Sequence, residues 1–169
     1  MSFELRLLSI FITSTYYHII TSSHHHITTS PHHHIITSTM TIFSKIIAGE
    51  IPCYKIAEDD RFFAFLDINP LTKGHTLVIP KLEEDYIFNL DDTMLSGLML
   101  FAKKIALAID KSVPCVRVGV AVIGLEVPHA HIHLIPFTRE SEMNFKNTKL
   151  KLSPEEMNEI ALSIRKNLE

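Results

Sequence analysis

The chain has 169 residues, a length that favours one domain, and its 46% hydrophobic and 21% charged residues are ordinary for a globular protein with a sizeable core. Sixteen Lys and Arg against nineteen Asp and Glu leave a formal charge of -3. This balance argues against duplex nucleic acid as the main partner, because no basic surplus exists to neutralise a long phosphate backbone. No stretch approaches the roughly 18–20 apolar residues of a membrane-spanning helix, so we expect no membrane partner.

The two cysteines, Cys53 and Cys115, lie far apart in the chain and form no C-x-x-C pair. Isolated thiols of this kind are typical of a reducing compartment and not of a disulfide framework. We therefore expect a cytoplasmic protein.

Residues 1–40 differ in composition from the rest of the chain, since Ser, Thr, Ile and His each occur seven times there. Two histidine triplets, at 24–26 and 32–34, lack the fixed geometry that selects a particular metal ion. We expect a low-complexity leader that is disordered or non-native, with Met40 as a second possible start. The remaining residues, 41–169, are predicted to form the domain.

After the leader, the order of elements is a short helix, three strands, a long helix, two strands and a final helix. Apolar residues of the long helix recur at alternating steps of three and four from Leu95 to Ile109, which indicates one buried face. The last helix opens with Ser153-Pro154-Glu155-Glu156, a capping box with a first-turn proline. The pattern predicts an α+β domain with an antiparallel sheet of about five strands and two main helices. The expected ranges are a helix at 42–48, strands at 53–58, 62–66 and 75–79, a helix starting near 91 or 92, strands at 116–123 and 129–135, and a helix from 153 onward.

The segment Pro128-His-Ala-His-Ile-His-Leu-Ile-Pro136 is the most informative part of the sequence. On a strand, His129, His131 and His133 share one face at intervals of roughly 6.6 Å, while the apolar residues between them face the other way. Three imidazoles in a row are costly to bury without hydrogen-bond partners, so the row indicates a functional site.

Two chemistries suit such a row, and spacing alone leaves both open. Neutral imidazoles can ligate zinc. Alternatively, His131 attacks phosphorus as a nucleophile, while the flanking imidazoles orient it or donate hydrogen bonds to phosphate oxygens.

The run H-A-H-I-H-L-I resembles the His-φ-His-φ-His-φ-φ signature, where φ is apolar, of the histidine triad (HIT) nucleotide hydrolases and transferases. The segments T-I-F-S-K-I-I-A-G-E-I-P, E-D-D-R, F-L-D-I-N-P and K-G-H-T-L-V-I-P-K are similar to the Hint-like branch, in order and at suitable separations. The resemblance covers about residues 41–140 and implies a HIT-like fold.

The resemblance also implies a role for individual residues. His131 matches the nucleophile that attacks the α-phosphorus, His129 and His133 match its flanking partners, and His75 matches a fourth histidine near the site. Asp67 matches the acid that accepts hydrogen bonds from the ribose hydroxyls. The apolar pocket for the base is matched by Ile42, Phe43, Ile46, Phe65 and Ile68.

Family members release a nucleoside monophosphate from phosphoramidates, adenylylated compounds or dinucleoside polyphosphates. The resemblance therefore implies a hydrolase for purine nucleotide substrates that forms a nucleotidyl-histidine intermediate. It implies no cofactor, no metal ion held by the triad, and a homodimer whose sheets join across the two-fold axis.

Residues 121–127 depart from the family pattern. The family often has an asparagine on this strand and then a Gly-Gln-Ser/Thr stretch that grips phosphate, whereas this chain reads A-V-I-G-L-E-V. We expect the backbone N–H of Gly124 to contact phosphate still. We expect Glu126 to turn away, to pair with a cation or to favour less negatively charged substrates. The departure keeps one alternative open, a nucleotide-binding regulatory module with little catalysis. A zinc protein that uses the same histidines is a further alternative, which rests on the row of imidazoles itself.

Overall fold

The computed structural model describes residues 40–168 of the chain. The predicted leader lies outside the described residues, apart from Met40. The described helices and strands are α2 (Ile42–Ile47), β1 (Lys55–Glu58), β2 (Phe62–Leu66), β3 (Thr76–Pro80), α3 (Asp92–Ser112), β4 (Arg117–Ala121), β5 (Ile132–Phe137) and α4 (Pro154–Lys166), with 3-10 turns η1 (Ile87–Asn89) and η2 (Glu140–Met143).

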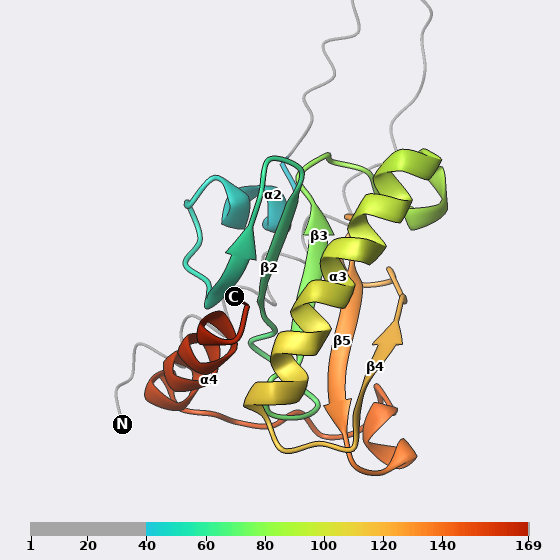
Figure 1. Cartoon of the computed structure of the whole chain (residues 1–169). Coiled ribbons are helices and arrows are strands. Elements are labelled where there is room, and N and C mark those ends of the chain that lie inside the picture. The colour runs from blue at the N-terminus through green and yellow to red at the C-terminus, as the bar shows by residue number, and fades with distance from the viewer. Residues whose placement is uncertain (1–39, 169) are drawn as a thin grey trace, which may run out of the picture. The chain divides into compact units, whose positions relative to one another are not determined.

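The five strands form one antiparallel sheet in the order β1-β2-β3-β5-β4. Helices α3 and α4 cover one face of this sheet, and the short helix α2 lies on the other (Figure 1). The predicted α+β class, the sheet of about five strands and the two main helices are confirmed.

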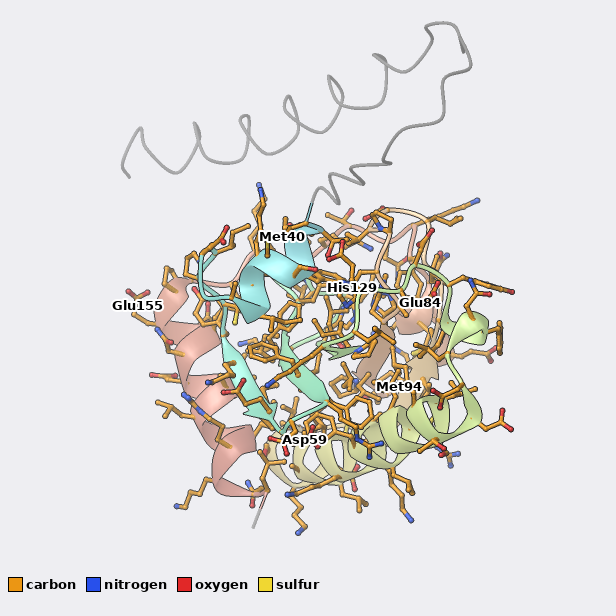
Figure 2. All side chains as sticks on the ribbon, turned by 90° about the horizontal axis from the view of Figure 1, so that it is seen from above. Met40, Asp59, Glu84, Met94, His129 and Glu155 are labelled. Atoms are coloured by element: carbon orange, nitrogen blue, oxygen red, sulfur yellow. The ribbon has the colours of Figure 1, made fainter. Side chains whose placement is uncertain are left out.

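Alternation along the strands divides the apolar side chains between the two faces of the sheet. Toward α3 and α4, the larger core contains Ala64, Val78, Ile132 and Leu134 from the sheet. The smaller cluster on the opposite face is formed by Phe63, Phe65, Leu77 and Ile79 with Phe43 of α2. Figure 2 shows the sheet edge-on, with α2 and α3 on opposite sides.

Both long helices start where the capping signals predict. The Asp91 side chain accepts a hydrogen bond from the Met94 N–H at 2.8 Å, and Asp91 is the N-cap of α3. Ser153 and Glu156 form the reciprocal capping box of α4, with each side chain accepting from the backbone N–H of the other. These caps satisfy backbone donors that the first helical turns leave free.

The prediction that the histidine strand starts at His129 is wrong, because β5 starts at Ile132. The His129 N–H donates to the Val127 carbonyl at 2.8 Å, and the Ala130 N–H donates to the Glu84 carbonyl. The backbone N–H groups there are hydrogen-bonded within a turn and to the segment before η1, so they do not pair with a neighbouring strand of the sheet. A side-chain pattern does not report where backbone pairing stops.

Other strand boundaries shift by one or two residues, with β1 starting at Lys55 and β4 covering Arg117–Ala121. Pro136 is the penultimate residue of β5 and lies opposite Val118. Among the helices of residues 40–168, none combines the length and apolar character needed to cross a membrane.

Candidate active site

The four histidines that the sequence singled out lie together on the α2 side of the sheet. His133 stands on β5 opposite Leu77, a residue of the smaller apolar cluster. His75 directly precedes β3, and His129 and His131 lie on the segment that leads into β5. Exposure is 0% for His129 and 2% for His75, against 6% for His131 and 8% for His133. His131 and His133 are therefore the most accessible of the four.

His129 is fixed at both ring nitrogens. Nε2 lies 2.9 Å from the Pro80 carbonyl oxygen, which can only accept, so this nitrogen carries a proton. Nδ1 lies 2.9 Å from the Thr41 hydroxyl. Burial lowers the pKa of His129, so the neutral ring accepts from Thr41 at Nδ1.

The ring of His131 turns back onto the main chain two residues earlier. Its Nδ1 lies 2.6 Å from the His129 carbonyl oxygen and must therefore donate. In the neutral ring this tautomer leaves Nε2 with a free lone pair. The structure thus gives the predicted nucleophile an unprotonated nitrogen without requiring a neighbouring base.

His75 and His133 belong to a second series of hydrogen bonds, which starts at a backbone N–H donor. The Leu71 N–H donates to His75 Nδ1 at 3.1 Å, so the neutral His75 carries its proton on Nε2. That nitrogen lies 3.0 Å from His133 Nδ1, which accepts. His133 therefore holds its own proton on Nε2. Next to the predicted nucleophile, the fold places an imidazole with an N–H donor.

Burial keeps these two rings uncharged. It lowers the pKa of His75 and of His133 to about 3, with smaller contributions in the same direction from Lys149 and His131. Both rings therefore stay neutral throughout the physiological range, and the tautomers assigned above persist.

Asp67 lies beside His75 but does not form an ion pair with it. The two side chains approach to 3.6 Å at Asp67 Oδ2 and His75 Nδ1, and Nδ1 is already an acceptor. Asp67 Oδ1 accepts from the Asn69 N–H at 2.8 Å, and burial raises the pKa of the carboxyl. Oδ2 forms no hydrogen bond within the described chain, which leaves it available to a ligand hydroxyl.

The residues predicted to hold the base are divided between core and surface. Phe43 and Phe65 are buried, and their ring centroids are 5.5 Å apart in an edge-on arrangement. Ile42 and Ile46 are partly buried against the same cluster, whereas Ile68 is 62% exposed. The Phe43 ring centroid lies 5.3 Å from that of His131, so the apolar cluster directly adjoins the triad.

The segment that departs from the family pattern runs along the surface. Gly124 has a φ of 69°, a left-handed conformation that suits glycine. Glu126 is exposed, and no ion pair among residues 40–168 includes it. We expected this carboxylate to turn away from the site, to pair with a cation or to favour less negatively charged substrates. The structure fits the first of these, because the side chain is exposed to solvent.

A family model described as the HIT domain matches residues 48–140. The chain belongs to the histidine triad family. It is 40% identical over 135 residues to an uncharacterized HIT-like protein of Borreliella burgdorferi, covering 75% of this chain and 97% of the relative.

Two further histidine triad proteins are informative. An adenosine 5'-monophosphoramidase of Saccharomyces cerevisiae is 41% identical over 96 residues, covering 56% of this chain and 61% of the yeast protein. The crystal structure of a zinc-bound histidine triad family protein from Mycobacterium smegmatis superposes with a TM-score of 0.65 at 28% identity, covering 75% of this chain and 90% of that chain.

Two residues beside the triad were missed by the sequence reasoning. The Phe145 ring centroid lies 4.9 Å from that of His133 and 6.4 Å from that of His75. Lys149 donates to the Phe145 carbonyl at 2.7 Å, with its ammonium 5.5 Å from that ring centroid. The Leu150 N–H anchors the segment to the Pro70 carbonyl. No spacing or motif in the sequence points to this contact, because it joins residues remote from the signature.

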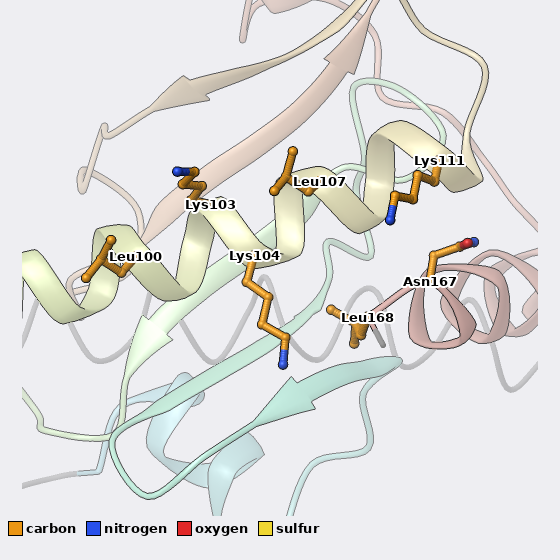
Figure 3. Close-up of a pocket in the computed structure, with 7 residues that line it drawn as sticks. All are labelled: Leu100, Lys103, Lys104, Leu107, Lys111, Asn167 and Leu168. Atoms are coloured by element: carbon orange, nitrogen blue, oxygen red, sulfur yellow. The ribbon is translucent and has the colours of Figure 1, made fainter.

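A separate shallow cavity of about 320 Å³ lies between α3 and the end of α4 (Figure 3). Its lining combines three leucines, Leu100, Leu107 and Leu168, with three lysines and Asn167, and it contains no histidine or carboxylate. Because α3 and α4 cover the sheet face opposite α2, this cavity is remote from the triad.

The buried imidazoles make stability depend on pH. Between pH about 3 and about 6.5 the unfolded chain binds protons that the folded His75 and His133 do not, so the free energy of unfolding falls as pH decreases from about 7 to about 4. We expect His75→Asn, whose side-chain oxygen can accept from the Leu71 N–H, to show a shallower dependence. Urea unfolding across this range measures the slope, and parallel curves for the two proteins would contradict the assignment.

Proposed function

We propose that this histidine triad protein hydrolyses purine nucleoside phosphoramidates, adenylylated compounds or dinucleoside polyphosphates at the α-phosphorus. The observation that carries the proposal is the hydrogen bond from His131 Nδ1 to the His129 carbonyl, because it leaves the Nε2 lone pair free. Imidazole in this form is a nucleophile at neutral pH.

In the proposed first step, His131 Nε2 attacks the α-phosphorus and the bond from phosphorus to the leaving group breaks. For a phosphoramidate, the departing amine takes a proton from solvent. The adduct is a nucleotidyl-imidazolium whose Nδ1–H still points at the His129 carbonyl. That acceptor stabilises the positive charge which develops on the ring.

In the second step, water attacks the same phosphorus and the bond to Nε2 breaks. The nucleoside monophosphate leaves, the water proton returns to solvent, and His131 is regenerated. The His133 Nε2–H, kept in place by the chain from Leu71 through His75, is suited to donate a hydrogen bond to a phosphate oxygen in both steps.

The name of the yeast relative supports the substrate class, since that protein is an adenosine 5'-monophosphoramidase. In this chain, the apolar cluster around Phe43 adjoins His131 and suits a flat base, and Asp67 Oδ2 is free to accept from a ribose hydroxyl. The absence of the Gln-Ser/Thr pair near Gly124 favours a second candidate, a nucleotide-binding module with little turnover.

Zinc binding by the same histidines has one observation in its favour: Asp67, His75 and His133 offer ligand atoms within 4.8 Å of one another. The hydrogen bonds within this group oppose it. His75 Nδ1 already accepts from the Leu71 N–H, and His75 Nε2 carries the proton donated to His133. A metal ion would have to displace a backbone donor or remove that proton, so we favour the nucleophile.

Removing the nucleophile tests the mechanism. We expect His131→Ala to abolish hydrolysis of adenosine 5'-phosphoramidate while the circular dichroism spectrum stays that of a folded protein. In the parent protein, rapid quenching and mass spectrometry should locate an adenylyl adduct on His131. Parental turnover by the variant would contradict the proposal, whereas tight binding of adenosine monophosphate without turnover by the parent would favour the binding module.

Asp67 is tested by comparing sugars. We expect Asp67→Ala to raise KM for the ribonucleotide substrate by about tenfold to a hundredfold, the loss expected for one hydrogen bond to a charged group, and to change KM for the 2'-deoxy analogue less. Asp60→Ala, at an exposed turn, is the matched control. Equal losses on both sugars would exclude a ribose contact.

We also propose a homodimer in which the sheets join through β4. This edge strand and the residues after it expose Val120, Val122 and Ile123, and its outer hydrogen-bonding side has no partner strand within the described chain. Light scattering should give twice the chain mass of 19.2 kDa. We expect Val120→Lys to give monomers, with Leu162→Lys on exposed α4 as the control; an unchanged mass for Val120→Lys would argue against this edge.

A further inference from the structure

Four polar side chains form an unbroken chain from the protein surface to the buried His129. The Ser44 hydroxyl donates to Glu83 Oε2 at 2.9 Å. The Ser44 and Thr41 hydroxyl oxygens are 2.9 Å apart, and Thr41 Oγ1 lies 2.9 Å from His129 Nδ1. Glu83 is exposed, Ser44 and Thr41 are half-buried, and His129 has no exposed surface.

These four side chains connect three separate parts of the fold by hydrogen bonds. Thr41 is the N-cap of α2 and accepts from the Ser44 N–H at 3.0 Å. Glu83 belongs to the segment between β3 and η1, and His129 to the segment before β5. In Figure 2, His129 lies beneath α2. No neighbouring pair in this chain except Thr41 and Ser44 is close in sequence, so only the tertiary fold brings the groups together.

The number of protons available fixes the donor in the hydrogen bond between Thr41 and His129. His129 Nε2–H is bound to the Pro80 carbonyl, so Nδ1 of the neutral ring needs the Thr41 proton. The Ser44 proton is directed to Glu83, which leaves the contact between the two hydroxyls without a proton of its own. With Glu83 ionised, two hydroxyl protons serve three contacts; each end contact takes one of them, because neither His129 Nδ1 nor the Glu83 carboxylate can donate.

The position of the His129 ring affects His131 through the backbone carbonyl of His129. The carbonyl that accepts from His131 Nδ1 belongs to His129, whose ring is held by Thr41 on one side and Pro80 on the other. The Phe43 ring, in the first turn of α2, packs edge-on against both imidazoles, with centroids 5.7 Å from His129 and 5.3 Å from His131. Movement of α2 or of His129 would therefore redirect the carbonyl that selects the His131 tautomer.

We propose that Thr41, Ser44 and Glu83 are positioning residues that hold His129, and through its carbonyl keep the proton of His131 on Nδ1. The inference rests on the proposed function for its effect on turnover, but its effect on the His131 ring can be measured without any substrate.

Substitutions of Glu83 and Thr41, near the outer and inner ends of this hydrogen-bonded series, separate the effect of hydrogen bonding from that of charge. In Glu83→Gln, the carboxamide NH₂ can donate to Ser44, so Ser44 can donate to Thr41 and Thr41 to His129. All three contacts are then satisfied with a neutral ring. Glu83→Ala removes the outer anchor. Thr41→Ser keeps both the hydroxyl and the helix cap, whereas Thr41→Val leaves His129 Nδ1 without a donor.

The kinetic arm measures kcat and KM for adenosine 5'-phosphoramidate. We expect Thr41→Val to lower kcat about tenfold or more, because small displacements of a reacting group have effects of this order, while Thr41→Ser and Glu83→Gln stay within about twofold of the parent. Glu83→Ala should fall between them. Glu84→Ala is the matched control, since its carboxylate accepts from the Tyr86 N–H and the Asn89 amide and forms no hydrogen bond with Thr41, Ser44 or His129 in the described structure.

The spectroscopic arm records ¹⁵N spectra of the imidazole nitrogens. We expect one tautomer of His131, with the proton on Nδ1, in the parent and in Glu83→Gln, and a mixture of tautomers in Thr41→Val. A Thr41→Val protein that keeps both the parental kcat and the single tautomer would overturn the proposal. If the parent hydrolyses no phosphoramidate, the proposed function fails, but the tautomer measurement still decides the positioning role.

Discussion

The hydrogen bond from His131 Nδ1 to the His129 carbonyl, at 2.6 Å, is the interaction on which the rest of the site depends. A backbone carbonyl can only accept, so it dictates which ring nitrogen holds the proton without any charged neighbour. The cost is that the main chain at His129 must leave the sheet and turn, which is why β5 starts three residues later than the side-chain pattern suggests. A regular strand would present three imidazoles on one face but would not bring this carbonyl within reach of the ring.

Burial is the second constraint, and it explains why histidine can occupy an almost closed site. An imidazolium without a counter-charge is strongly disfavoured there, so His75 and His133 stay neutral and act as directional hydrogen-bond groups. Each polar chain ends at a group that fixes its direction: the Leu71 N–H in one case, and the Pro80 carbonyl in the other. Among residues 40–168, these hydrogen bonds leave two triad nitrogens without a protein partner: His131 Nε2, which carries a lone pair in the neutral ring, and His133 Nε2, which carries a proton.

The two faces of the sheet have different functions. The larger core beneath α3 and α4 provides most of the burial, and the smaller cluster around Phe43 and Phe65 adjoins the histidines. Phe145 packs against His133 and His75 from the segment that leads to α4, and Lys149 brings a positive charge near the same rings.

The sequence by itself determined the fold class, the capping of α3 and α4, and the identity of the triad. These features follow from local signals: periodic apolar residues, Asp91 and Ser153 at helix starts, and three histidines at alternate positions. Residues 41–140 also carry enough similarity to indicate the family, which the family model confirms. The roles assigned to the histidines, Asp67, Gly124 and the apolar residues remain predictions; the structure shows that Asp67 Oδ2 lies 3.6 Å from His75 Nδ1 and that Phe43 packs against His131.

Only the tertiary structure decided which nitrogen of each imidazole carries the proton. The deciding partners are backbone groups of Leu71, Pro80 and His129 together with the Thr41 hydroxyl, and backbone groups have no signature in a sequence. The chain from Glu83 to His129 and the packing of Phe145 were hidden for the same reason. They join segments far apart along the chain, and hydrogen bonding depends on distance and direction, which only the folded chain defines.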